Sequence, residues 1–401
     1  MTSDPPSRDS FTLRATSWLR SHAGRGLFGV IMLWAVHAYA VYVLANAISH
    51  DPGQALWPNW RQDLHGWVTD VNAVPPVARF DSVWYYSIAT DGYPGTQGLA
   101  VYNAGFLPLY GLLMRWVGAG LGMEPYLAGV WISRIATLVG LILLYLYALR
   151  RPELKATPWA PVAALLFFPT GYLLVSVYAE ALFFACLMAT FYFAERRWFL
   201  AAFVAAFFAG LTRAHVLALI PAMFVLGVIK FREKRSVAVA LPMLGGITAI
   251  LSLGYYFKRV ANDPLLYVHR KAFFGSATGG PLVTIATTRA TIRDALERGT
   301  LGATYTLLEF PCAVILSVAA LYCVWKKHWA EAVLLAGTVG LNMMAGSLWG
   351  LPRYSIVMFP LFLLIGRLAK RPLVFSAYMV VGALTQALLL ANYVNFRAPA
   401  P

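Results

Sequence analysis

Residues 27–44 read LFGVIMLWAVHAYAVYVL, a run without a charged residue. A membrane-spanning helix needs about 20 mainly apolar residues, and this run reaches that length when residues 45–48 are included. The run is longer than the roughly 7–15 apolar residues of a cleaved signal peptide, although Ala45-Asn46-Ala47 has the small-x-small form of a cleavage site. We therefore interpret it as an uncleaved first span.

Similar apolar runs recur as far as residue 395, and the composition agrees with them. Of the 401 residues, 60% are hydrophobic and 12% are charged, whereas soluble domains carry about 25% charged residues. Neither a fixed-period repeat nor a low-complexity linker is evident. The sequence therefore predicts an all-α polytopic membrane protein with a single domain over residues 1–401.

The net charge of +15 raises the question of nucleic-acid binding. The basic residues, however, lie in short clusters between the apolar runs, as the positive-inside rule expects for cytoplasmic loops. We therefore expect membrane lipids as partners and no nucleic acid. The three cysteines lie in apolar runs without ligand spacing, which predicts small core residues rather than a disulfide or a metal site; they are Cys186, Cys312 and Cys323.

Six basic clusters determine the expected topology, because placing all of them in the cytoplasm fixes the parity of the crossings between them. They lie at residues 8–25, 150–155, 196–197, 230–235, 326–327 and 367–371. The result is a bundle of about 11 transmembrane helices with its C-terminus outside. We expect a cytoplasmic N-terminus at 1–26, a first outer loop at 49–126 and a second outer loop at 258–304.

Three shorter segments refine this topology. Phe106–Val117 is apolar but too short to span, and we interpret it as an amphipathic helix at the membrane interface. Residues 159–194 and 198–229 each begin and end at cytoplasmic clusters, so each must cross twice. Their outer turns are expected near Pro169–Glu180 and Thr212–His215.

Asp81 is the first candidate for chemistry, within residues 79–93, RFDSVWYYSIATDGY. Trp84 and Ile88 recur at helical spacing and Gly92 suits a helix end, which places Asp81 at the N-cap. Asp81 then either caps the helix by accepting a backbone N–H bond, or serves as a general base at a helix N-terminus. The two roles are compatible.

Glu180 follows Tyr178-Ala179 in the expected turn of the first hairpin. A carboxylate in an apolar hairpin is costly unless it reaches water or a partner. Glu180 is therefore either a residue at the water line, a partner of Arg134, or part of a site.

Basic residues converge on the same outer face. Arg213 in Thr212-Arg213-Ala214-His215 lies at the turn of the second hairpin, where a guanidinium can bind a lipid phosphate with two parallel hydrogen bonds or act as a snorkelling anchor. Arg353-Tyr354, at the outer start of an expected span, has the same two interpretations. Several basic residues of the second outer loop contact either anionic headgroups or solvent: Lys258, Arg259, Arg270, Lys271, Arg289, Arg293 and Arg298.

These residues make the chain resemble the polytopic mannosyltransferases of the GT-C superfamily, of the phosphatidylinositol-glycan class V type and its bacterial relatives. The resemblance covers most of the chain, in the order and spacing of the family. Phe80 stands where Trp is more usual in that family, and Tyr85 where His is common. The matching pieces are Arg79–Tyr85 with Ile88-Ala89 and Gly92-Tyr93, Phe106–Tyr110, Pro169-Thr170, Tyr178–Phe183, Leu211–Arg213 and Pro352–Tyr354.

The resemblance implies a GT-C-like bundle and inverting transfer of a sugar, mannose in this family, from a polyprenyl- or dolichyl-phosphate donor to a lipid or glycan acceptor. It implies a multi-pass protein of a bacterial plasma membrane with its active site on the outer face, and neither cofactor nor metal. Asp81 would be the catalytic base. The donor phosphate would contact Arg213, His215 and Arg353, and the substrates would contact Arg79, Tyr85, Tyr178, Glu180 and Tyr354.

Two rival functions stay open. A transporter or flippase of lipid-linked saccharide would also need lipid-phosphate arginines, but it would carry polar residues deep along a path through the membrane. Only His37 and Asn342 are candidates for such a path, which favours the enzyme. A ligase of lipid-linked glycans would use a large late outer loop, for which residues 258–304 are the candidate.

Overall fold

The computed structural model describes residues 22–49, 74–272, 279–298 and 304–395. Within these ranges every regular element is a helix. The prediction of an all-α membrane protein is confirmed at this level, because five helices are long and apolar enough to cross a membrane. The five are α2 (His22–Ile48), α6 (Pro125–Ala148), α11 (Leu241–Ala261), α14 (Thr304–Trp325) and α18 (Pro372–Val394).

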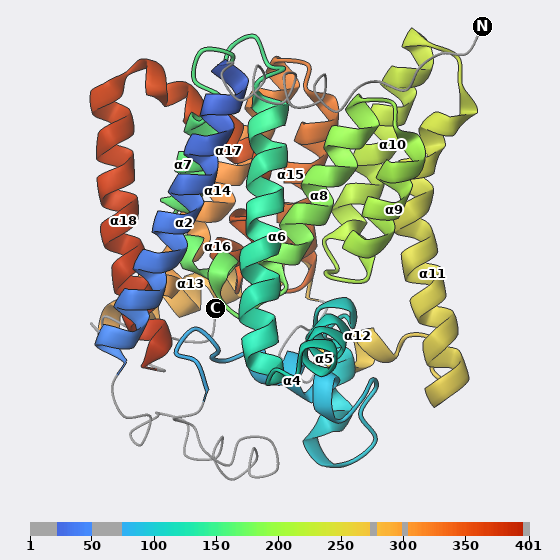
Figure 1. Ribbon diagram of the computed structural model, residues 1–401. Helices are drawn as coiled ribbons and strands as arrows, with labels where there is room; N and C mark the ends of the chain where they lie inside the picture. Colours follow the sequence, from blue (N-terminus) through green and yellow to red (C-terminus); the bar gives the residue numbers. More distant parts are fainter. Residues whose placement is uncertain (1–21, 50–73, 273–278, 299–303, 396–401) are drawn as a thin grey trace, which may run out of the picture.

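Shorter apolar helices fill the bundle between these five (Figure 1). Each of the two segments expected to cross twice contains two helices with a break at the predicted turn. The first break covers residues 167–179 and includes the 3-10 helix η4 (Gly171–Val175), and the second covers residues 211–215. The shorter apolar helices are α7 (Ala160–Leu166), α8 (Glu180–Glu195), α9 (Phe199–Gly210), α10 (Val216–Glu233), α15 (Trp329–Met344) and α17 (Phe359–Gly366). The first break separates α7 from α8, and the second separates α9 from α10.

The expected single span at residues 353–369 is wrong, because the chain forms two short helices there. Helix α16 (Leu351–Ser355) is followed by a non-helical stretch before α17 begins at Phe359. Gly350 has a φ of 82°, a left-handed conformation that favours glycine. Proline stands in the first turn of each helix, where a backbone N–H would have no partner within the helix. The chain therefore begins a new helix at α16 and again at α17.

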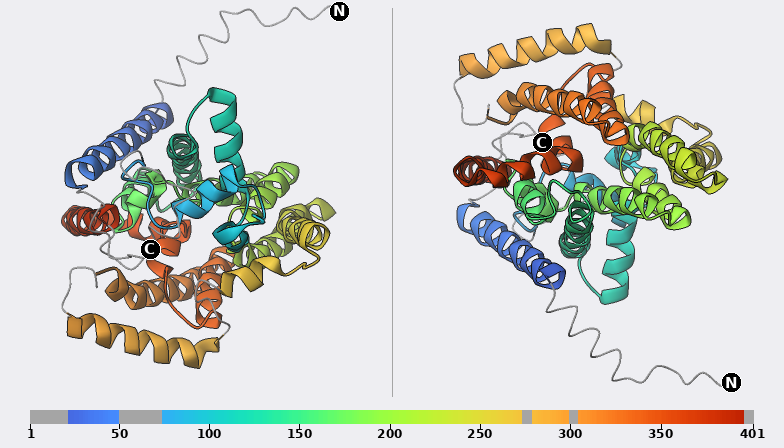
Figure 2. Two further views of the ribbon diagram at one scale, coloured as in Figure 1. Left: turned by 90° about the horizontal axis from the view of Figure 1, so that it is seen from below. Right: turned by 90° about the horizontal axis from the view of Figure 1, so that it is seen from above.

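A layer of short helices covers one end of the bundle. It consists of α4 (Ser82–Thr90), the 3-10 helix η3 (Gly98–Gly105), α5 (Leu109–Leu121) and α12 (Leu266–Lys271), with α13 (Gly280–Arg298) beside them. Helix α5 is seen end-on in Figure 1 and lengthwise in Figure 2, so it runs across the bundle axis. The prediction that this apolar segment does not span is consistent with this orientation. We call this end of the molecule the capped end.

Close backbone contact holds α4 against α5. A Cβ atom added at Gly111 of α5 would lie 2.5 Å from the Cβ of Ile88 and 2.9 Å from the carbonyl oxygen of Tyr85. Only glycine leaves room for this approach. The contact sets the position of α4, and therefore of Asp81 at its start.

Ion pairs dominate the opposite end of the bundle, where several of the basic clusters lie. Arg151 contacts Glu331 and Tyr147, and Arg367 contacts Glu153. The three cysteines are free, and Cys312 and Cys323 are buried.

Candidate functional site

The segment before α4 is fastened to two other parts of the chain. The hydroxyl of Tyr393 in α18 accepts a hydrogen bond from the backbone N–H of Arg79 at 2.9 Å and donates one to the carbonyl oxygen of Val77 at 3.1 Å. The backbone N–H of Val177 donates to the same carbonyl at 3.0 Å, and Ser82 Oγ donates to the carbonyl of Val177 at 3.0 Å. These bonds hold the start of α4 against the break that precedes α8.

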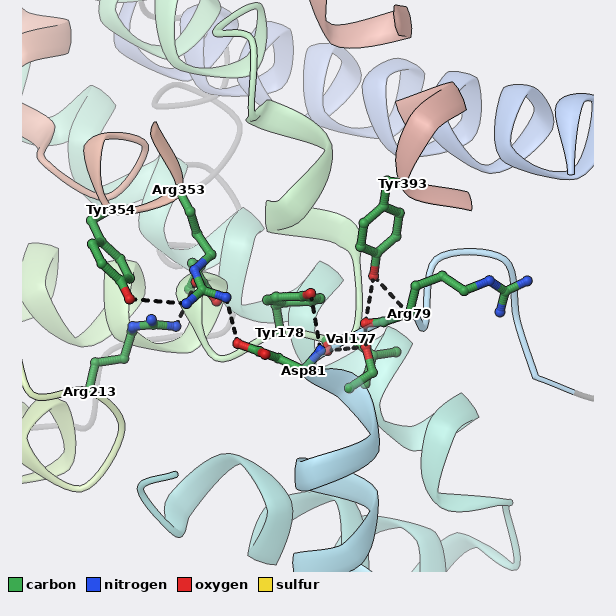
Figure 3. A network of polar contacts seen from close by, with 10 residues as sticks. Arg79, Asp81, Val177, Tyr178, Arg213, Arg353, Tyr354 and Tyr393 are labelled. Carbon is green, nitrogen blue, oxygen red and sulfur yellow. Dashed lines mark hydrogen bonds and ion pairs between the residues drawn. The ribbon is translucent and has the colours of Figure 1, made fainter. Parts of the chain in front are cut away.

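Arg79 takes part in this fastening with its side chain. Its guanidinium is buried and donates to the carbonyl oxygens of Val74, Pro75, Ala78 and Val394. In Figure 3 it points away from Asp81. These bonds tie the Arg79 side chain to backbone carbonyls of its own segment and of α18, whereas the resemblance implied contact with substrate.

Asp81 stands at the N-cap of α4, but its side chain makes no capping hydrogen bond. The capping role considered for it is therefore wrong. Its backbone is already helical, with φ −57° and ψ −17°, so the side chain is not directed at the first N–H groups as an extended N-cap residue would be. Instead Oδ2 accepts a hydrogen bond from Nη1 of Arg353 at 2.6 Å (Figure 3).

Glu180 opens α8 and is fully buried, and two arginines surround it. Its Oε1 lies 2.6 Å from Nη1 of Arg213 and 3.1 Å from Nε of Arg353. The considered pairing with Arg134 is wrong, as is a place at the water line, because the side chain is 0% exposed. A buried carboxylate must be paired to be tolerated, and both partners come from distant turns of the chain.

Arg353 therefore connects both carboxylates. It lies in α16, whose position is fixed by a 2.9 Å hydrogen bond from Thr170 Oγ1 to the carbonyl of Pro352. Its Nη2 also donates to the hydroxyl of Tyr354 at 3.1 Å. We call Asp81, Glu180, Arg213, Arg353 and Tyr354 the polar cluster.

The arginines were expected to bind a donor phosphate, and the structure shows them occupied by carboxylates instead. Arg213 is 10% exposed and its guanidinium lies 5.0 Å from the ring centre of Tyr354, so it is not a snorkelling anchor. In the cluster only Asp81 is appreciably accessible among the charged side chains, at 18%.

His215 and Lys271 border the polar cluster. The ring of His215 lies 4.4 Å from that of Tyr354, and its Nε2 is buried without a hydrogen-bond partner among the described residues. Lys271, at the end of α12, lies with its ammonium 4.7 Å from the ring centre of Phe106. Burial lowers the pKa of Lys271, while Tyr354 and Asp81 raise it. With Lys271 protonated, three cationic side chains face two carboxylates.

Tyrosines form the walls around the cluster. The hydroxyl of Tyr178 accepts a hydrogen bond from the backbone N–H of Asp81 at 3.3 Å. Tyr85 is buried, with edge contacts to the rings of Phe106 and Tyr110 at 5.5 and 5.0 Å. Burial raises the pKa of Tyr85. These contacts make both tyrosines packing residues of the site.

Sequence reasoning singled out Asp81, Glu180, Arg213, His215, Arg353 and Tyr354, and the structure brings them together. It did not single out Tyr393, which fastens Arg79, and it named Lys271 only as one of seven loop basic residues. No local signal marks either residue, because both act through contacts distant in the chain. In the part of the chain that the structure describes, no three His, Cys, Asp or Glu side chains gather as a metal ion would need.

Comparison of the chain with protein-family models, curated proteins and solved structures finds no match.

Proposed function

We propose that this protein is an inverting glycosyltransferase of the GT-C type. It would transfer a sugar, mannose in the family that the motifs resemble, from a polyprenyl-phosphate donor to a hydroxyl of a lipid or glycan acceptor. The observation that carries the proposal is the arrangement of Asp81. It is a partly accessible carboxylate held by Arg353 beside a group of cationic side chains, at the capped end of a membrane bundle.

The two carboxylates differ in what they can do. Glu180 is fully buried between two guanidinium groups, so it balances charge and holds Arg213 and Arg353 in place. Asp81 accepts the hydrogen bond from Arg353 with Oδ2 alone, and no hydrogen bond among the described residues uses Oδ1. Oδ1 is therefore the oxygen that an acceptor hydroxyl can approach.

The proposed reaction is a single displacement. The acceptor hydroxyl oxygen attacks the anomeric carbon of the sugar and forms the new glycosidic bond. Its proton passes to Oδ1 of Asp81, and the bond between the anomeric carbon and the phosphate oxygen breaks with its electron pair going to the phosphate. The leaving lipid phosphate gains negative charge, which cationic side chains at the site stabilise.

The phosphate is best placed near Lys271 and His215. Arg213 and Arg353 already meet carboxylates, so their charge is partly used, and Lys271 brings a third cationic side chain to the edge of the polar cluster. The unpartnered Nε2 of His215 can hydrogen-bond a phosphate oxygen. This assignment keeps the donor phosphate at the capped end, and we propose that this end lies on the outer face of a bacterial plasma membrane.

Two deep polar residues argue against a transport path. His37 of α2 contacts Gln386 of α18 at 3.0 Å, and Gln386 donates to the carbonyls of Leu166 and Phe168. These bonds satisfy the backbone at the break after α7, as irregular structure inside a membrane requires. Asn342 donates to the carbonyl of Thr338 in its own helix. Both residues therefore have structural partners.

The test is sugar transfer by purified protein in proteoliposomes that contain labelled polyprenyl-phosphate mannose and a lipid extract as acceptor. We expect labelled product with wild type and a loss of about 10²–10⁴-fold with Asp81→Asn, the usual contribution of a general base. Movement of the donor between leaflets without any product, unchanged in Asp81→Asn, would establish the flippase instead.

A further inference from the structure

Arg134 is the single charged residue of α6 and lies in the middle part of that helix. Its guanidinium carbon is 5.6 Å from the ring centre of Tyr42 in α2 and 5.6 Å from that of Trp131, one turn earlier in α6. Two aromatic rings from neighbouring helices therefore hold the guanidinium at the seam between α2 and α6.

No carboxylate among the described residues pairs with this charge. None of the ion pairs among the described residues includes Arg134, and its buried Nε has no hydrogen-bond partner there. An arginine within a membrane helix is costly unless its charge finds a partner. Arg213 and Arg353 both meet carboxylates, whereas Arg134 is able to take an anionic partner from the surrounding lipid.

The surface around Arg134 faces away from the bundle interior. Tyr42 is 50% exposed, Trp131 is 44% exposed and Ile135 is 57% exposed. These large apolar side chains lie on helices long enough to span a membrane. The seam between α2 and α6 is therefore a lipid-facing surface that also carries a charge.

The guanidinium is directed toward the capped end. Side chains of a helix lean toward its N-terminus, and α6 begins at the capped end, so the contact with Trp131 has the expected direction. At about 1.5 Å per residue, Trp131 lies roughly 9 Å from the first residue of α6. This depth brings the guanidinium within reach of the headgroup region of that leaflet.

We infer that Arg134, Tyr42 and Trp131 form a binding site for the phosphate of a lipid whose chains lie against α2 and α6. The guanidinium offers planar N–H donors to the phosphate oxygens, and the aromatic rings restrict its orientation. This inference does not depend on the proposed enzymatic activity. The phosphate can belong to a bulk anionic phospholipid or to a polyprenyl phosphate, since both present the same group.

The experiment is native mass spectrometry of the purified full chain with added phosphatidylglycerol, and with a diacylglycerol as the matched lipid that lacks the phosphate. We expect Arg134→Gln to lose retention of phosphatidylglycerol by about tenfold or more, as for a lost charge-assisted hydrogen bond, and to keep its retention of diacylglycerol. The matched control is Arg115→Gln, which removes an exposed arginine of α5 at the same capped end. It should retain phosphatidylglycerol like wild type.

Displacement of phosphatidylglycerol by equimolar undecaprenyl phosphate would identify the polyprenyl lipid as the preferred occupant, and its failure would identify bulk phospholipid. Either result supports a lipid-phosphate site. If Arg134→Gln does not fold, Trp131→Leu replaces it, and we expect that variant to lose several-fold in retention. Equal retention by wild type and the folded seam variant would overturn the inference and leave Arg134 a snorkelling residue.

Discussion

Nη1 of Arg353 lies 2.6 Å from Oδ2 of Asp81, although the two residues are 272 positions apart in the chain. The same guanidinium reaches Glu180 through Nε at 3.1 Å. One arginine therefore joins the start of α4 to the start of α8 and holds the accessible carboxylate in a defined orientation.

Replacing Arg353 should destabilise the protein as well as inactivate it. Removing one partner of a buried ion pair costs about 3–5 kcal/mol, since the other charge stays buried. We expect Arg353→Met to lower the melting temperature of the solubilised protein clearly and Arg353→Lys to lower it less. The matched control is Arg197→Met, whose pair with Glu233 is exposed and contributes about 0–1 kcal/mol. Equal effects at both positions would contradict the proposed role of Arg353.

The pairing of Glu180 with Arg213 predicts coupling between the two residues. Glu180→Gln leaves Arg213 without its carboxylate partner, and Arg213→Gln leaves part of the charge of Glu180 unmatched. We expect each single variant to be destabilised and the double variant to be less destabilised than the sum, by about 0.5–3 kcal/mol in a double-mutant cycle. Thermal unfolding of the four proteins measures this. Strict additivity would show that the two side chains act separately.

Variants of Asp81 separate its proposed catalytic role from helix capping, because its side chain does not cap α4; both variants below also remove the carboxylate that pairs with Arg353. We expect Asp81→Asn to abolish most transfer while donor binding changes little. Asp81→Ala should lose activity equally, without the roughly 1 kcal/mol that a lost N-cap would cost. Donor binding and melting temperature are measured on both variants. A much larger stability loss for Ala than for Asn would restore the capping role.

Lys271 predicts a pH dependence of donor binding. Because burial lowers the pKa of Lys271, its positive charge is present at low pH and is lost as the pH rises through this lowered value. The affinity for polyprenyl phosphate should therefore fall at a lower pH than it would if Lys271 had the pKa of an ordinary lysine. Titration of binding against pH in wild type and Lys271→Gln measures this.

Lys271→Gln should bind polyprenyl phosphate more weakly at neutral pH. Its affinity should also no longer fall as the pH rises through the pKa of Lys271. The facing groups that also carry charge are Asp81, Tyr354, Arg213 and Arg353. Lys258→Gln serves as the control, since that side chain is exposed and bonds to Asn262. A profile that keeps its step in Lys271→Gln would assign the step to another of the facing groups.

The orientation of the bundle is tested by labelling introduced cysteines with a membrane-impermeant reagent in intact cells. We expect Gly279→Cys to be labelled, and Lys234→Cys and Lys327→Cys to be labelled only after permeabilisation. The native cysteines are buried or partly buried and are replaced by alanine in the parent protein. Labelling of Lys234→Cys in intact cells would invert the orientation and move the polar cluster to the cytoplasmic face.

Local pattern alone determined much of the architecture. The apolar runs predict membrane helices because the free energy of removing each side chain from water depends chiefly on that residue and its neighbours in the same helix. The breaks at residues 167–179 and 211–215 followed from the spacing of basic clusters. The candidate residues could be named for the same reason, since an ionisable side chain beside an apolar run is costly wherever it packs.

Only the tertiary structure decided which charges meet. Sequence spacing offered Arg134 as a partner for Glu180 and a backbone N–H as a partner for Asp81, and both assignments were wrong. The actual partners lie on α16 and on the α9–α10 turn, brought there by helix packing and by the break at Gly350. An ion pair forms where two side chains are adjacent in space, and the local sequence around one partner does not identify the other.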